Sequence, residues 1–157
     1  MAKTTRATQF LDKAGVAYTT ATYDYDPNAE RIGLQAAEAI GEHPSRVLKT
    51  LMAELDGKPV CVVVPSDKEV SMKKLASAFG GKSAAMMKPA NAEKLTGFVV
   101  GGISPFGQKK QVPTAIEISA MDEALVYMNG GQRGLQVRLS PQDALRALGA
   151  IAAPLTA

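Results

Sequence analysis

Lys49 is the first residue of the sequence whose type and surroundings suggest chemistry. It lies in the apolar segment Val47–Ala53, which is typical of a strand. The alternation of side chains along a strand places Lys49 on the same face as Val47, Leu51 and Ala53. A lysine directed into an apolar face costs free energy unless an anion, a carbonyl group or a cleft receives its ammonium group. The segment predicts either a binding or catalytic lysine, or a lysine near a sheet edge whose long stem reaches water.

A loop rich in glycine is the second candidate for chemistry, with the sequence Gly101-Gly102-Ile103-Ser104-Pro105-Phe106-Gly107. It follows the apolar run Phe98–Val100, which suggests a strand. Paired glycines allow positive φ and let bare backbone N–H groups approach a ligand closely. Such amides bind a phosphate group or a developing oxyanion. The alternative is a tight turn that binds no ligand. Lys109 and Lys110 follow the loop, and they either contact a phosphate or form a solvated pair.

The chain contains one cysteine, Cys61, and one histidine, His43. Cys61 lies in the middle of an apolar run, a position typical of packing rather than nucleophilic catalysis. His43 precedes Pro44 in an expected loop, so we predict an exposed residue rather than a general base. Two such side chains are too few for a zinc site of the usual kind. We therefore expect no metal and no other cofactor.

Helices interrupt the strands along the chain, whereas the turn signals indicate antiparallel pairs. Spacing and capping residues predict helices over Thr4–Ala14, Ile32–Ile40, Ser71–Phe79 with Ser71 as N-cap, Pro89–Leu95, and from Pro141 onward with Ser140 as N-cap. Strands are predicted over Val16–Tyr23, Arg46–Leu55, Pro59–Val64, Thr114–Ile118, Leu125–Met128 and Leu135–Leu139. Asp56-Gly57 indicates a hairpin, and the unbroken apolar run Val60–Val64 indicates a strand covered on both faces. The predicted fold is α+β, with a curved, mixed, mostly antiparallel sheet flanked by helices.

Length and composition favour one ordinary domain over residues 1–157, with 46% hydrophobic residues to form its core. The chain has 18 Lys and Arg residues against 15 Asp and Glu residues. This balance permits a local basic rim that holds an RNA end, but it does not indicate a protein whose surface is covered by nucleic acid. A single cysteine fits a reducing compartment. The sequence shows neither the apolar core of a secretory signal nor a membrane-spanning stretch, so we expect a cytoplasmic protein without a membrane partner.

Four segments spread over nearly the whole chain match, in order, the motifs of one known family. They are Tyr23–Pro27, Val47–Leu51, residues 97–110 and Asn129–Leu135. In that order they resemble an early turn, the lysine strand, the signature loop and a later glycine motif of the YbaK family of aminoacyl-tRNA deacylases. That family is related to the editing domain inserted in bacterial prolyl-tRNA synthetases. The resemblance implies a mixed sheet flanked by helices, hydrolysis of misacylated tRNA, and cysteine on proline tRNA as a substrate.

The resemblance also implies roles for individual residues, with Lys49 and Gly101 as the catalytic positions. The positions implied to bind the substrate are Tyr23, Ile32, Thr50, Gly102, Ile103, Ser104, Pro105 and Asn129. Three positions depart from the cysteine-specific members. Asn129 replaces a serine, Gln136 an aspartate and Ile32 an aromatic residue. These departures bear on which amino acid is cleaved rather than on the reaction.

The implied reaction is compatible with this short list of residues, because an aminoacyl ester is already activated. We expect Lys49 to orient the terminal phosphate or the carbonyl region, and the amides of Gly101 and Gly102 to stabilise the oxyanion. For cysteine, the resemblance implies attack by the substrate's own thiol. One alternative is hydrolysis of alanine or another small amino acid by water. The other is a non-catalytic module that binds tRNA ends or a synthetase.

Recognition of a particular tRNA is not visible in the sequence. Four phenylalanines, four tyrosines and no tryptophan provide no aromatic platform for single-stranded RNA. We therefore expect specificity for the tRNA(Pro) acceptor end to come from a partner, with prolyl-tRNA synthetase as the candidate.

Overall fold

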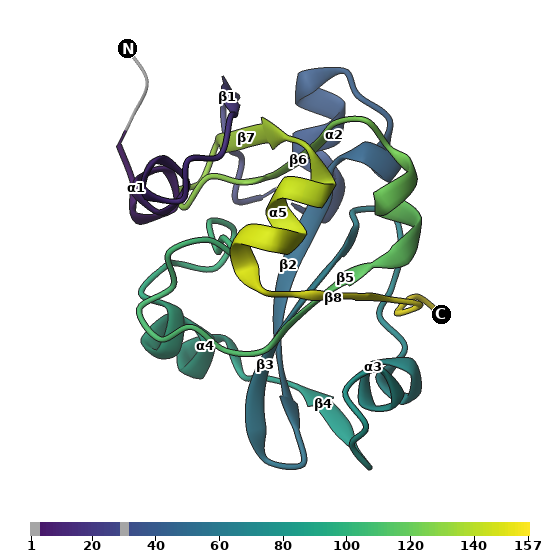
Figure 1. Ribbon diagram of the computed structural model, residues 1–157. Coiled ribbons are helices and arrows are strands. Elements are labelled where there is room, and N and C mark those ends of the chain that lie inside the picture. The colour runs from purple at the N-terminus through teal and green to yellow at the C-terminus, as the bar shows by residue number, and fades with distance from the viewer. Residues whose placement is uncertain (1–3, 29–31) are drawn as a thin grey trace.

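Helices flank two β-sheets in the computed structural model, which describes residues 4–28 and 32–157 and, of residues 32 and 33, the backbone only (Figure 1). The helices are α1 (Arg6–Lys13), α2 (Ile32–Ile40), α3 (Met72–Ala78), α4 (Pro89–Thr96) and α5 (Pro141–Leu148), with the 3-10 helices η1 (Pro44–Arg46) and η2 (Ile118–Asp122). The strands are β1 (Thr19–Thr22), β2 (Leu48–Leu55), β3 (Lys58–Pro65), β4 (Ala84–Met86), β5 (Thr114–Glu117), β6 (Val126–Asn129), β7 (Leu135–Leu139) and β8 (Ile151–Ala153). The predicted α+β class is confirmed.

The strands are divided between two sheets rather than joined in one. The larger sheet has the order β4-β2-β3-β5-β8, and the smaller has the order β1-β7-β6. All pairs are antiparallel except β3 with β5 and β5 with β8, so the mixed, mostly antiparallel character is as predicted. A single bridge between Val47 and Tyr127 connects the start of β2 to β6. This bridge brings the lysine strand against the smaller sheet.

The hairpin between β2 and β3 sets the register of Lys49. Asp56 and Gly57 both have positive φ, 50° and 83°, as a two-residue type I′ turn requires. Leu55 therefore pairs with Lys58, and the ladder continues until Lys49 stands opposite Val64. The predicted turn is confirmed, and a slip of one residue would move Lys49 to the other face of the sheet.

Strand β3 is covered on both faces, as its unbroken apolar run predicted. Cys61 and Val63 face the main core, to which α1, α5 and both sheets contribute. Val60, Val62 and Val64 face a second core, where α3 packs on the opposite side of the larger sheet. Burial of such a side chain stabilises the fold by roughly 1.5–3 kcal/mol. The β2–β3 hairpin is therefore a rigid support for Lys49.

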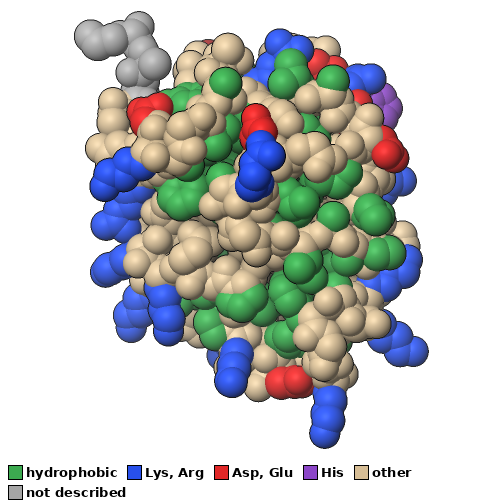
Figure 2. Space-filling model, in the orientation of Figure 1, with side chains coloured by type: hydrophobic (Ala, Val, Ile, Leu, Met, Phe, Trp, Pro, Cys, Tyr) green, Lys and Arg blue, Asp and Glu red, His purple; other side chains and the backbone are tan. Residues whose placement is uncertain are grey.

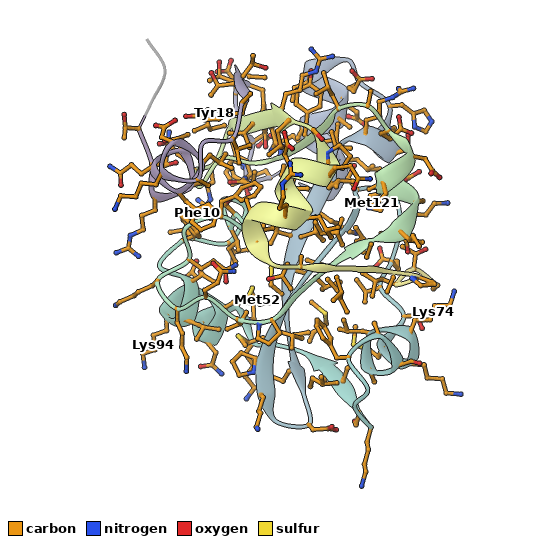
Figure 3. The ribbon with its side chains drawn as sticks, viewed as in Figure 1. Phe10, Tyr18, Met52, Lys74, Lys94 and Met121 are labelled. Carbon is orange, nitrogen blue, oxygen red and sulfur yellow. The ribbon has the colours of Figure 1, made fainter. Side chains whose placement is uncertain are left out.

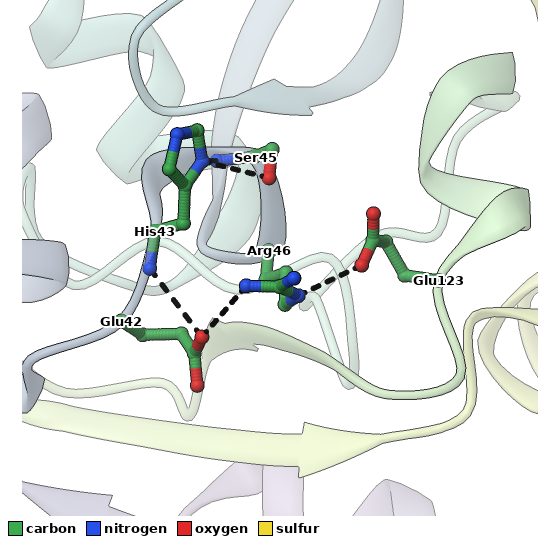
Figure 4. A network of polar contacts seen from close by, with 5 residues as sticks. All are labelled: Glu42, His43, Ser45, Arg46 and Glu123. Carbon is green, nitrogen blue, oxygen red and sulfur yellow. Dashed lines mark hydrogen bonds and ion pairs between the residues drawn. The ribbon is translucent and has the colours of Figure 1, made fainter.

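The segment that leads from α2 into β2 is fastened at the surface (Figure 4). His43 is exposed, as predicted, and its Nδ1 accepts the backbone N–H of Ser45 at the start of η1. Arg46 pairs with Glu42 at 3.0 Å and with Glu123, the residue that follows η2, at 2.8 Å. Exposed ion pairs contribute little individually. Their position nevertheless connects the start of β2 to η2.

Several boundaries differ from the sequence-based prediction. The run Phe98–Val100 is not a strand, because α4 ends at Gly97 in the left-handed conformation and the chain then turns. Strand β1 covers only Thr19–Thr22. The three-residue strands β4 and β8 were not predicted, because three residues are too few for alternation to be visible. No helix in the described part of the chain has the length and apolarity to cross a membrane.

Candidate active site

A pocket of about 380 Å³ lies beside β2, where this strand meets α4 and the smaller sheet. Its walls are mostly apolar, and Met52 of β2 contributes from inside the molecule, whereas Lys94 of α4 extends away from it (Figure 3). Of the residues that the sequence implied, the pocket brings together Tyr23, Lys49, Thr50, Gly101, Ile103 and Asn129. The side chain of Ile32 lies outside the described part of the chain, although this residue begins α2.

Lys49 combines features of both interpretations that its strand allowed. It shares a strand face with Leu51 and Ala53, which pack against the second core, while Val47 belongs to a small cluster with α2. The Lys49 side chain is 20% exposed, and its Nζ lies 3.8 Å from Glu69 Oε1, on a side chain that is 88% exposed. An ion pair so long and so exposed is weak. The ammonium group is therefore available to a ligand in the pocket.

The glycine-rich loop begins with a tight turn that needs glycine. Gly102 N–H donates to the carbonyl oxygen of Val99 at 2.8 Å, and φ is positive at Gly101 but not at Val100. These features define a type II turn with Gly101 in its third position. A Cβ on Gly101 would lie 2.5 Å from the hydroxyl of Tyr25. The amide of Gly102 is thus engaged within the turn, contrary to its expected contact with an oxyanion.

Side chains from three separate elements hold the centre of this turn. Val100 N–H donates to Glu93 Oε2 of α4 at 2.8 Å, and Arg133 Nε donates to the Val100 carbonyl at 2.9 Å. Asn129 Nδ2 of β6 donates to the Gly101 carbonyl at 3.2 Å. From Val100 N–H to the Gly101 carbonyl, every backbone polar group thus has a partner among the described residues except Gly101 N–H. Gly101 lines the pocket, so this amide is a donor available to a ligand.

The remainder of the loop is mainly structural. Ile103 lines the pocket, and its N–H also lacks a partner among the described residues. Ser104 and Pro105 are buried away from the pocket lining, and Ser104 Oγ accepts the N–H of Phe106 at 3.1 Å. The Phe106 ring stacks on Phe10 of α1 with centroids 6.0 Å apart. Ser104 and Pro105 therefore anchor the loop, and the structure does not place them in the pocket.

Two of the three departures that the resemblance implied stand opposite each other. Asn129 of β6 and Gln136 of β7 are register partners, and both line the pocket. Asn129 Oδ1 accepts the N–H groups of Gly131 and Gln132, so both ends of its amide are bonded to the protein. Gln136 is only 4% exposed, and its Oε1 has no partner among the described residues. Thr50 Oγ1 is likewise buried and unpartnered.

Tyr23 stands beside Gln136 at the pocket wall. Burial raises the pKa of Tyr23 above its usual value, the charge of Tyr25 raises it further, and hydrogen bonding with Gln136 and Gly134 acts in the opposite direction. Tyr23 is therefore a neutral phenol at physiological pH. In this state its hydroxyl both donates and accepts hydrogen bonds.

Cys61 is a packing residue, as predicted. It is fully buried in the main core, and burial raises the pKa of its thiol to about 12. Gln108 Nε2 lies 3.7 Å from its Sγ. In the described residues, no group of three or more His, Cys, Asp or Glu side chains is placed to hold a metal ion.

The sequence pattern of the aminoacyl-tRNA editing domain matches residues 26–147, which is most of the chain. The chain belongs to this family. The editing domain is similar to the proposed Cys-tRNA(Pro)/Cys-tRNA(Cys) deacylase EbsC of Enterococcus faecalis, with 32% identity over 143 residues that cover 90% of this chain and 86% of EbsC. It is 25% identical over 144 residues to the multifunctional Ser/Thr-tRNA deacylase ProXp-y of Escherichia coli K12, covering 90% and 85% of the two chains.

A solved structure shares the fold of this editing domain. The crystal structure of a proposed trans-editing enzyme for prolyl-tRNA synthetase superposes with a TM-score of 0.81 at 22% identity, covering 97% of this chain and 95% of that one. The resemblance to the YbaK family is therefore confirmed. The relatives are aminoacyl-tRNA deacylases, so the chain is an enzyme of this class, acting on misacylated tRNA in the service of translation fidelity.

Sequence reasoning missed the residues that brace the glycine loop of the editing domain. Arg133 lies within the recognised glycine motif Asn129–Leu135, and this membership was its only signal in the sequence. Glu93 gave no signal, because a glutamate on a short helix is usually solvated. Met86 and Met87 also line the pocket, and only the pairing of β4 with β2 brings them there.

Proposed function

We propose that this protein is a trans-editing deacylase that removes cysteine from Cys-tRNA(Pro). The composition of the pocket carries the proposal. Lys49 and the amide of Gly101 line it, whereas its described lining residues include no cysteine, serine, histidine or carboxylate. The hydroxyl of Thr50 has no hydrogen-bonded base beside it that would activate it. Such a pocket can orient and polarise an ester but offers no nucleophile of its own. A cysteinyl ester supplies the nucleophile itself, because its side chain carries a thiol.

The proposed step balances within the substrate. The cysteine sulfur forms a bond to the ester carbonyl carbon, and the bond from that carbon to the ribose oxygen breaks. The thiol proton passes to the ribose oxygen, so the tRNA leaves with a free hydroxyl and the amino acid leaves as a small ring. Negative charge develops on the carbonyl oxygen beside Gly101 N–H, and one such donor is worth about 2.7–4 kcal/mol in the transition state. Lys49 orients the terminal phosphate or the carbonyl region.

A basic edge of the molecule that includes α4, a helix of the pocket wall, supports a tRNA acceptor end as the partner. Figure 2 shows Lys and Arg side chains along the edge formed by α1 and α4. The exposed basic residues of these elements and of the segments next to them are Arg6, Lys13, Lys88, Lys94, Lys109 and Lys110. Phosphate contacts of this kind give affinity without sequence information. We therefore assign specificity for tRNA(Pro) to a second protein, with prolyl-tRNA synthetase as the proposed partner in the cytoplasm.

The whole of residues 1–157 is proposed to act as one deacylase unit. Helix α1 precedes the matched residues 26–147, yet its Ala7 and Leu11 belong to the main core. The backbone of Arg6 also packs so closely on Gly107 that a Cβ there would lie 2.3 Å from the Arg6 carbonyl oxygen. The position of the glycine-rich loop thus depends on α1.

A hydroxyl amino acid is the second candidate substrate, and a specific observation favours it. Thr50 Oγ1 and Gln136 Oε1 are buried in the pocket wall without partners. An O–H group is a better donor to an amide oxygen than the weakly donating S–H group of cysteine. An alanine side chain would leave both oxygens unpaired, at about 1–3 kcal/mol each. ProXp-y, the relative named for seryl- and threonyl-tRNA, supports the same possibility.

Release of labelled amino acid from Cys-, Ser-, Ala- and Pro-tRNA(Pro) tests the proposal, with wild type and Lys49→Ala in parallel. We expect release from Cys-tRNA(Pro), loss of this release in the variant, and no release after the substrate thiol is blocked. If serine is released from Ser-tRNA(Pro) in preference to cysteine, the substrate is a hydroxyl amino acid instead. Preferred release from Ala-tRNA(Pro) would replace the thiol route with attack by water. If no substrate is cleaved, the chain acts as a binding module and the proposal fails.

A second arm of the same assay tests the partner. Cysteine is charged onto tRNA(Pro) and onto a tRNA with a different acceptor stem, and release is measured with and without prolyl-tRNA synthetase. We expect the chain alone to cleave both substrates at similar rates, and the synthetase to confer a preference for tRNA(Pro). A strong preference in its absence would place the recognition within this chain.

A further inference from the structure

Arg133 touches the glycine loop from outside the pocket. It lies in the turn between β6 and β7, and its Nε donates to the Val100 carbonyl at 2.9 Å. Its guanidinium carbon lies 5.1 Å from the centre of the Tyr25 ring. The hydroxyl of the same tyrosine fills the space that a Cβ on Gly101 would need. Arg133 and Tyr25 thus form one layer behind the turn that presents Gly101.

The bond from Arg133 reaches the peptide group that carries the free amide. The carbonyl of Val100 and the N–H of Gly101 belong to one planar, conjugated unit. A donor on the oxygen withdraws electron density through that unit and strengthens the N–H as a donor, as in cooperative hydrogen-bond chains. A charged donor has a larger effect than a neutral one. The positive charge of Arg133 therefore acts on Gly101 N–H without touching a substrate.

The same bond also selects the orientation of this peptide. In the turn from Val99 to Gly102, type I and type II forms differ by a rotation of the central peptide, which joins Val100 to Gly101. Rotation would direct a carbonyl oxygen to the side where Gly101 N–H now lies, and a carbonyl repels an oxyanion. The hydrogen bond from Arg133 to the Val100 carbonyl oxygen favours the type II orientation of this peptide.

The neighbouring peptides are held independently of Arg133. Glu93 accepts Val100 N–H from the peptide before, and Asn129 donates to the Gly101 carbonyl of the peptide after. Only the central peptide therefore depends on the arginine for its orientation. Loss of the Arg133 side chain should leave the loop in place and release this one group.

We propose that Arg133 is a positioning residue that orients and polarises the Val100–Gly101 peptide so that Gly101 N–H stabilises the oxyanion of the editing reaction. The proposal rests on the proposed deacylase function. It assigns the arginine to turnover rather than to tRNA binding, which is the other role open to an exposed arginine.

Arg133→Gln removes the charge, and Arg138→Gln is its matched control. Arg138 is an exposed residue of β7 whose guanidinium carbon lies 5.8 Å from the Tyr127 ring, so it also covers a tyrosine. Within the described residues, no hydrogen bond or ion pair joins its side chain to the glycine loop. With the aminoacyl-tRNA that wild type cleaves, we expect kcat of Arg133→Gln to fall about 10²-fold, as for loss of one oxyanion donor. We expect KM to stay within about twofold, and Arg133→Lys, which keeps the charge, to recover part of kcat.

Two kinetic outcomes would overturn the proposal. A raised KM with unchanged kcat, together with a weaker salt dependence of binding, would make Arg133 a phosphate contact. An equal loss of kcat in Arg138→Gln would indicate a general effect of surface charge. Thermal melting of all three variants identifies any that fail to fold. If Arg133→Gln fails to fold, the kinetics of Arg133→Lys still decide the test.

A measurement without substrate separates this inference from the proposed function. The amide proton of Gly101 is followed by NMR in wild type, Arg133→Gln and Arg138→Gln. We expect an upfield shift of the Gly101 proton in Arg133→Gln and an unchanged resonance in Arg138→Gln. An unchanged Gly101 resonance in both variants would refute the polarisation. If wild type cleaves no aminoacyl-tRNA, the proposed function fails, while the resonance still reports whether Arg133 acts on the peptide.

Discussion

Two buried polar regions of this fold differ in whether the protein itself satisfies them. Glu117, at the end of β5, is 5% exposed, and its carboxylate accepts the N–H groups of Ser119 at 3.0 Å, Leu155 at 2.7 Å and Thr156 at 3.1 Å. Burial alone would raise the pKa of Glu117, but these backbone N–H groups lower it more, so the net pKa lies below its usual value. This carboxylate fastens the C-terminal segment to the larger sheet.

The pocket wall shows the opposite arrangement. Thr50 Oγ1 and Gln136 Oε1 are also buried but have no partner among the described residues. A buried polar atom without a partner costs about 1–3 kcal/mol, and most buried polar side-chain atoms in proteins have one. The Glu117 cluster illustrates how completely this fold can satisfy a buried group. The difference indicates that Glu117 serves stability, whereas the pocket wall retains its bonding capacity for a ligand.

The largest expected effect on the pocket side comes from Lys49→Ala. We expect deacylation to fall by at least about 10²-fold, as when a preorganised charge or donor is removed from a transition state. The melting temperature should change little, because the only ion pair of Lys49 in the described structure is the long, exposed one with Glu69. Amino acid release and thermal melting measure the two quantities. Lys58→Ala, at the exposed end of the same hairpin, is the control and should retain full activity.

The largest effect on the stability side is expected for Glu117→Gln. The amide replaces a charged acceptor by a neutral one, so we expect a loss of about 2 kcal/mol in the free energy of unfolding. For a chain of this size that corresponds to a fall of roughly 5 °C in Tm. The rate of deacylation per folded molecule should be unchanged. A loss of activity without a loss of stability would contradict the separation of the two regions.

Acid should reproduce the effect of Glu117→Gln. Because the folded-state pKa of Glu117 is lowered, its contribution is complete above the unfolded-state value of about 4.3 and is lost as pH falls through the folded-state pKa. The difference in unfolding free energy between wild type and Glu117→Gln should therefore shrink below about pH 4. Urea unfolding over a series of pH values measures it. A difference independent of pH would assign the effect to packing.

Thr50→Val should separate stability from activity in the other direction. The substitution keeps the side-chain shape and removes an unpartnered hydroxyl, so we expect an equal or higher Tm. Deacylation should fall about 10-fold if the hydroxyl bonds the substrate, which corresponds to about 1.4 kcal/mol. Gln136→Leu should behave similarly for the same reason. A lower Tm together with full activity would mean that the two side chains are structural after all.

The smallest effect is expected for Glu69→Gln. Its carboxylate is nearly fully exposed and lies 3.8 Å from Lys49 Nζ, so the pair is worth about 0–1 kcal/mol. We expect a change in deacylation of less than about twofold. A larger change would show that Glu69 holds Lys49 in its working position and that the pocket lysine is not independently oriented.

Local sequence patterns determined the frame of this protein and its most prominent candidate. The Asp56-Gly57 turn and the apolar runs on either side of it predicted the β2–β3 hairpin, because turn chemistry and the alternation of side chains act over a few residues. Lys49 was visible for the same reason, as a charge in an apolar strand. The paired glycines made the loop that contains Gly101 visible, and the resemblance to YbaK proteins added Asn129; both residues line the pocket.

Only the tertiary structure decided which of these groups remain free to act. Gln136 alternates with the apolar Leu135 and Val137 along β7, and its burial in the wall of the pocket is seen only in the fold. The amide of Gly102 was a candidate, but in the fold it bonds to Val99, and Arg133 donates to a carbonyl 33 residues away. Hydrogen-bond partners this distant depend on how strands and loops meet in space. A local pattern carries no information about such distant contacts, so the fold was needed to show which of the two predicted glycine amides stays unbonded and which side chains support it.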